Sequence, residues 1–123
     1  MGNELTQKPG IENKIEIYEL FAAEALLASG TSTSGAVNLH QRSGYFSIFF
    51  TITGTGAAKF EYLISHDNVT FVEPASASDI ATGKTAGSDA VSFAPVLAPY
   101  IKIRVTETGG AQAIGVTLTL AVV

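Results

Sequence analysis

Apolar and polar residues alternate with a period of two along much of the chain, which is typical of β-strands with one buried face. The pattern is clearest in residues 45–53, 59–65, 100–108 and 113–122. In the first of these segments, one face carries Phe46, Ile48, Phe50 and Ile52. The alternation therefore predicts four strands whose apolar faces contribute to a common core.

Glycines mark the turns between these strands. The run GTG at residues 54–56 predicts a tight hairpin between the first two strands, and Gly109 with Gly110 predicts a turn into the last strand. Residues 73–90 are small, polar and Gly-rich, and they predict one long loop with at most a short strand or turn. Pro95 and Pro99 then indicate edge or irregular structure.

Residues 14–29 allow two interpretations. Their Ala, Leu and Glu content favours a helix, whereas the alternation of Ile15 and Ile17 with the residues beside them favours a strand. We predict a strand, because the rest of the chain has β character. Residues 30–35 are predicted to form a loop, and residues 36–39 a short strand.

About seven or eight short antiparallel strands, separated by turn signals, predict an all-β fold. The expected architecture is a single β-sandwich with jelly-roll or Greek-key connections, and the length of 123 residues fits one domain. We assign residues 14–123 to this sandwich. Residues 1–13 are polar and contain a Pro-Gly pair, which is typical of an N-terminal arm rather than of a core element.

Charge is scarce along the chain. Only 15% of the residues are charged, against roughly 25% in typical soluble domains, and the net charge is −4. A weakly acidic chain without a basic cluster is a poor ligand for nucleic acid, and no run of about 20 apolar residues indicates a membrane span. The chain has no cysteine, which excludes disulfides and thiolate metal sites. An uncharged surface of this kind is typical of contact with a protein partner.

Candidate catalytic and metal-binding residues are few. His66 and Asp67 suggest half of a catalytic dyad, but the run SHDN at residues 65–68 is typical of a turn. His40 is the only other histidine, so a His-rich metal site is excluded. Four acidic residues lack the alternation of a dedicated calcium loop: Asp67, Glu73, Asp79 and Asp89. The chain also lacks a G-x-S-x-G motif, and we predict no catalysis, no cofactor and no metal.

Several apolar residues are predicted to lie outside the core. Phe49 and Leu63 fall on the outward faces of adjacent hairpin strands, where an isolated monomer favours polar side chains, so we expect them to contact a second protein surface. An alternative use of Tyr45, Phe49 and Tyr100 is an aromatic platform for a glycan. The predicted protein interface combines arm and strand residues: Glu4, Leu5, Ile11, Tyr45, Phe49 and Leu63.

The runs SGYFS, TGTG, SHDNVTF and APYIKIRVTETGG occur in this order. In this they resemble small β-sandwich proteins of tailed phages and prophages, over roughly residues 20–123. The resemblance implies a virion protein made in the host cytoplasm, such as a decoration protein that binds the major capsid protein at the capsid surface. It also implies a homo-oligomer, specifically a trimer, whose arm or loop contacts the capsid. The alternative is a carbohydrate-binding or host-adhesion module of a phage particle.

Overall fold

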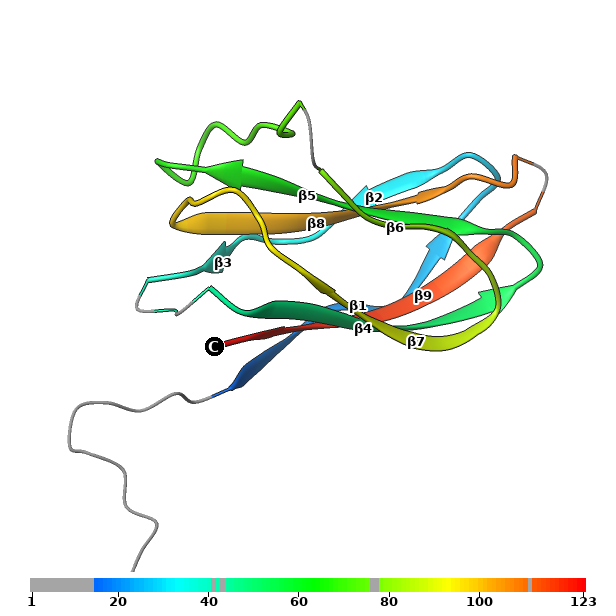
Figure 1. Cartoon of the computed structure of the whole chain (residues 1–123). Helices are drawn as coiled ribbons and strands as arrows, with labels where there is room; N and C mark the ends of the chain where they lie inside the picture. Colours follow the sequence, from blue (N-terminus) through cyan, green and yellow to red (C-terminus); the bar gives the residue numbers. More distant parts are fainter. Residues whose placement is uncertain (1–14, 41, 43, 76–77, 111) are drawn as a thin grey trace, which may run out of the picture.

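The computed structural model describes residues 15–40, 42, 44–75, 78–110 and 112–123. These residues form nine strands and no helix, and hence no helix that could cross a membrane. The strands build two antiparallel sheets packed face to face (Figure 1). Their bounds are β1 Glu16–Leu26, β2 Thr31–Thr33, β3 Val37–Asn38, β4 Phe46–Gly54, β5 Ala58–Ser65, β6 Asp79–Lys84, β7 Gly87–Phe93, β8 Tyr100–Glu107 and β9 Ile114–Val122. The predicted arm, residues 1–13, lies outside the described residues.

The strand order is that of a jelly roll. One sheet has the order β1-β9-β4-β7 and the other β2-β8-β5-β6, with β2 and β3 lying one after the other along β8. The chain changes sheet at six of its eight connections, including β1 to β2, β4 to β5, β6 to β7 and β8 to β9. Such interleaving of two sheets is what distinguishes a jelly roll from a meander. The predicted β-sandwich is confirmed.

The core lies between the two sheets. The rings of Phe50 from one sheet and Phe60 from the other are 4.5 Å apart. The central strand β8 adds three fully buried side chains, Ile101, Ile103 and Val105. The buried faces predicted from the alternation are therefore confirmed. Strand β1 also confirms the strand interpretation of residues 14–29.

The hairpin predicted at residues 54–56 is wrong. Strands β4 and β5 lie in different sheets, so residues 55–57 form an arch between the sheets. In a hairpin the apolar faces of both strands point the same way, whereas across an arch they point at each other. The period-two alternation is the same in both cases. Gly109 and Gly110 likewise belong to an arch, from β8 to β9.

The long loop predicted at residues 73–90 is wrong in part. It contains β6 and the first residues of β7, which form one edge of each sheet. An edge strand is half-exposed and needs few apolar side chains, so small polar residues are compatible with it. The same reason explains why the predicted loop at residues 30–35 contains β2, another edge strand.

Candidate interaction surface

The outward-pointing residues of the β1-β9-β4-β7 sheet form a surface that we call face A. The strand register places them in four levels across the sheet: Ile17, Ala121, Ser47 and Ser92; Glu19, Thr119, Phe49 and Ala90; Thr117, Thr51 and Ser88; Ala25, Gly115 and Thr53. Ile15, Tyr45 and Val123 extend face A at one end. Glu19 is the only residue with a charged side chain among these positions. Face A is therefore nearly uncharged, and its small side chains favour a flat surface.

Large apolar side chains are exposed at one end of face A and in its middle. Tyr45 is 75% exposed, Ile17 67% and Phe49 56%. A shallow hollow of about 570 Å³ lies beside Tyr45, and its lining includes Ala121 and Val123. Tyr45 and Phe49 therefore point outward as the alternation predicts. Their role in binding another protein stays a prediction.

Leu63 does not belong to face A. It lies on β5, in the other sheet, and is half-buried on the opposite side of the sandwich from Phe49. Phe49 and Leu63 were expected to lie close together because a hairpin was predicted between their strands. Since β4 and β5 lie in different sheets, this expectation is wrong. The other predicted interface residues, Glu4, Leu5 and Ile11, lie outside the described residues.

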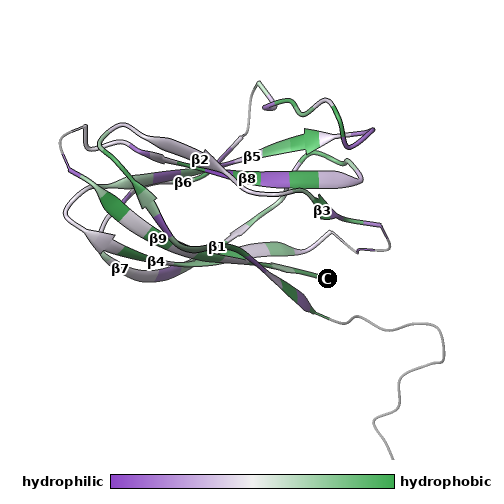
Figure 2. Cartoon of the chain, turned by 180° about the vertical axis from the view of Figure 1, so that it is seen from behind, coloured by the Kyte–Doolittle hydropathy of each residue, from purple (hydrophilic) through white to green (hydrophobic). Residues whose placement is uncertain are grey.

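The outer face of the β2-β8-β5-β6 sheet carries charges instead. Arg104 on β8 donates to Glu61 at 2.9 Å and to Glu73 at 2.6 Å. The ammonium of Lys59 lies 3.3 Å from a carboxylate oxygen of Glu61 and 3.5 Å from one of Asp79. The hydrophilic colour on β8 in Figure 2 marks part of this surface. The two outer faces thus differ: one holds an ion-pair network, and the described positions of the other hold a single charged side chain.

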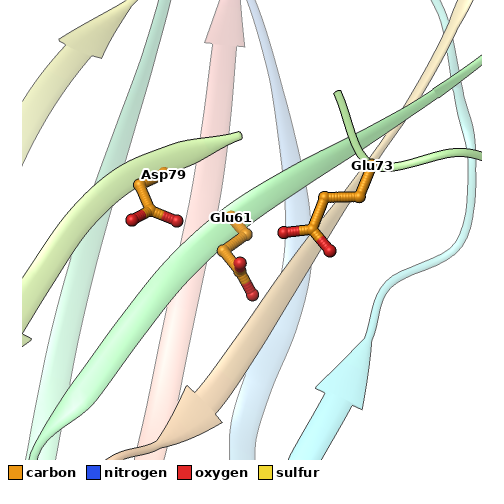
Figure 3. A group of neighbouring side chains, drawn as sticks. All are labelled: Glu61, Glu73 and Asp79. Carbon is orange, nitrogen blue, oxygen red and sulfur yellow. The ribbon is translucent and has the colours of Figure 1, made fainter. Parts of the chain in front are cut away.

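Three carboxylates of this network lie close together (Figure 3). Oxygens of Glu61, Glu73 and Asp79 come within 4.8 Å of one another, which is close enough to share a metal ion. Two basic side chains already neutralise them, however. The hydroxyl of Ser78, which donates to Glu73 at 2.7 Å, and the guanidinium of Arg104 lower the pKa of Glu73 to about 2. The cluster fits an ion-pair network that fastens the β5–β6 connection to β5 and β8.

Two other acidic residues considered for calcium lie apart from this cluster. Asp89 pairs with the lysine that ends β6, at 3.1 Å. Asp67 accepts hydrogen bonds from the N–H groups of Thr70 and Val69, each at 2.9 Å, and these bonds lower its pKa. Asn68 has a φ of 61°, a left-handed conformation that Asn tolerates. The turn predicted for the SHDN run is confirmed.

The two histidines lie at the end of the sandwich where the β3–β4, β5–β6 and β7–β8 connections meet. We call this end, which is opposite the β4–β5 arch, the loop end. His40 and His66 line one hollow of about 590 Å³, together with Leu97 and residues beside it. The ring of His40 lies 5.9 Å from that of Tyr100. The sequence carries no sign that the two histidines share a hollow, because only the fold brings the β3–β4 and β5–β6 connections together.

Glu107 was not among the predicted site residues, and it holds together three connections that cross between the sheets: β1–β2, β4–β5 and β8–β9. Its side chain accepts hydrogen bonds from the N–H groups of Ala57 (3.0 Å), Ser29 (2.9 Å), Gly110 (2.9 Å) and Gly109 (2.7 Å). The residue is 1% exposed. The amides of Ala57 and then Ser29 contribute most to lowering the pKa of Glu107 to about 2, while desolvation opposes them. The sequence did contain a signal that Glu107 is buried. The alternation of β8 that places Ile101, Ile103 and Val105 inward places Glu107 inward as well.

Comparison with solved structures places this fold among viral and phage proteins. One similar structure is that of the PBSX exported protein XepA, with a TM-score of 0.59 and 15% sequence identity, over 91% of this chain and 38% of that one. A structure of infectious bursal disease virus, Gx strain, has a TM-score of 0.53 and 15% identity, over 96% and 35% of the two chains. The enzymatically active domain of bacteriophage CBA120 tailspike protein 4 has a TM-score of 0.53 and 11% identity, over 89% and 19%.

What these likenesses show is the fold. The chain is a β-sandwich of a kind that phage and viral proteins contain. It spans less than two fifths of the length of each of these three structures. No family model matches the sequence, and no curated protein matches it either.

Proposed function

We propose that this chain is a non-enzymatic structural protein of a phage particle, and that it decorates the capsid surface by binding the major capsid protein and stabilising the head. The contrast between its two outer faces carries the proposal. Face A exposes Tyr45, Phe49 and Ile17 beside a single charged side chain, that of Glu19. Exposed apolar area of this kind favours contact with another protein. The fold that the chain shares with viral and phage proteins supports the same reading.

The arm is the proposed contact with the capsid. Leu5 and Ile11 supply apolar side chains, and Glu4 supplies a charge that can be matched by a basic group. An extended chain of 13 residues spans up to about 45 Å, so the arm can reach well beyond the compact body. Many copies that each add a modest contact stabilise a shell.

Co-sedimentation with capsids that lack the chain tests this function. We expect the full chain to pellet with the capsids and to raise their resistance to heat. Deleting residues 1–13 should leave the sandwich folded, because the nine described strands begin at Glu16 and the described core begins at Phe21. The deletion should weaken capsid binding roughly tenfold or more. The double substitution Leu5→Ala with Ile11→Ala should weaken capsid binding in the same direction as the deletion. Gln7→Ala, which removes a polar side chain of the same arm, is the matched control and should leave binding unchanged.

Two results would contradict this reading. A full-length chain that stays in the supernatant argues against the decoration role. A truncated chain that binds as tightly as the full one argues against the arm as the contact.

A second candidate function is glycan binding, which the hollow at the loop end favours. Its volume of about 590 Å³ is large enough for a small ligand. The imidazoles of His40 and His66 and the exposed Leu97 supply polar and apolar contacts there. Saturable binding on a glycan array that His66→Ala abolishes, in a chain indifferent to capsids, would favour this function.

A further inference from the structure

Face A is suited to stack on another flat sheet. Apart from Phe49, the positions on its two central strands are Ser, Thr, Ala and Gly, whose short side chains let two sheets approach to about 10 Å. Thr119 and Thr51 lie near its middle, and Glu19 on the edge strand β1 is its one charged side chain. We propose that face A binds a second copy of this chain, face to face, around a two-fold axis.

The size of face A is compatible with a stable pair. Four strands spaced at about 4.8 Å give a width of about 19 Å. The nine residues of β4 give a length of about 30 Å. The product is roughly 600 Å² for each copy, or roughly 1,200 Å² for the pair, which reaches the lower end of specific protein interfaces. Such a pair forms in a concentration-dependent manner.

Face A also carries a protrusion beside a hollow. Tyr45 stands at the border of the hollow, whose lining includes Ile15, Ser47, Ala121 and Val123. In an isologous pair every contact occurs twice, so the Tyr45 of each copy can enter the hollow of the other. Aromatic side chains in such positions contribute strongly to the binding energy of interfaces.

A second copy fits face A better than a charged partner does. A charged surface placed on face A would lose its water and gain few counter-charges, because Glu19 is the one charged side chain there. A second copy brings an equally uncharged surface. A flat face can be covered fully by one other flat face but not by two at once, so the geometry favours a dimer over the trimer that the sequence resemblance implies.

Sedimentation velocity of the full chain alone, from about 1 to 200 µM, tests this inference. We expect a monomer–dimer equilibrium. Replacing Phe49 by Glu places two carboxylates in the pair and should raise the dimer dissociation constant roughly tenfold or more. Tyr45→Ser should also weaken the dimer. The matched control is Leu97→Glu, because Leu97 is 92% exposed at the loop end, outside face A.

The melting temperature of each variant shows whether it is folded. If Phe49→Glu does not fold, Tyr45→Ser alone tests the inference. A chain that stays monomeric at every concentration, or that sediments as a trimer, would overturn the inference. So would a dimer that Leu97→Glu weakens as much as the face A variants do. The experiment contains no capsid, so its outcome is separate from that of the proposed decoration role.

Discussion

Replacing Glu107 by Gln tests whether one buried carboxylate fastens the arches. The carboxylate accepts hydrogen bonds from Ser29, Ala57, Gly109 and Gly110, in three different connections. An amide of the same shape has one oxygen in place of two, and it turns its NH₂ group toward backbone N–H donors. Hydrogen bonds to charged groups are among the stronger ones. We expect Glu107→Gln to lower the melting temperature by roughly 5–10 °C at pH 7.

The same substitution should change how stability depends on pH. The pKa of Glu107 is lowered from 4.5 to about 2 in the folded protein. Its stabilising effect is therefore fully present above about pH 5 and is lost as the pH falls towards 2. Thermal unfolding from pH 7 to pH 2 should show a smaller loss of stability in Glu107→Gln than in the wild type. Asp79→Asn, the same change at an exposed ion pair, is the control. Equal pH dependence in wild type and Glu107→Gln would refute the reasoning.

Two further substitutions test the packing at either end of the sandwich. Tyr62→Phe removes the hydroxyl that accepts a hydrogen bond from Val96 N–H at 3.0 Å. Urea unfolding should show that the free energy of unfolding falls by about 1 kcal/mol. An unchanged unfolding midpoint would show that water replaces the hydroxyl. Gly56→Ala places a methyl group 2.6 Å from Glu107 Oε2 and should cost about 1–3 kcal/mol, whereas Gly35→Ala, with no atom within 4 Å, should cost less. Equal costs at the two glycines would contradict the close packing around Glu107.

The alternation of residues predicted which faces are buried but not which strands pair. The faces of β4 that carry Phe50 and of β5 that carry Phe60 were correctly placed in the core. Whether two alternating strands lie side by side or face each other depends on long-range pairing. β4 pairs with β9, some 60 residues further along the chain. No local pattern in residues 54–56 contains that information.

The candidate residues were predicted with the same mixture of success and failure. The exposure of Tyr45 and Phe49 follows from alternation alone, so it was predictable. The location of Leu63 depended on the pairing and was missed. Glu61 shows a third case: the alternation places it outward, and it does face outward, yet the β5–β6 connection and Arg104 cover it so that it is buried. Tertiary contacts of this kind are not encoded in the residues beside Glu61.

The edge strands of both sheets are poorly suited to pairing with a strand of another copy. Strand β1 shifts register twice between Glu19 and Glu24, and Ala23 within this stretch has a φ of 52°. Strand β6 also shifts register twice against β5, while β2 and β3 have three and two residues. Strand β7 carries the exposed Asp89 opposite Phe50, on its inward side. Bulged, short and charged edges are poor templates for adding another strand. In the pair proposed above, association through face A closes after one partner, whereas pairing through edges would continue from copy to copy.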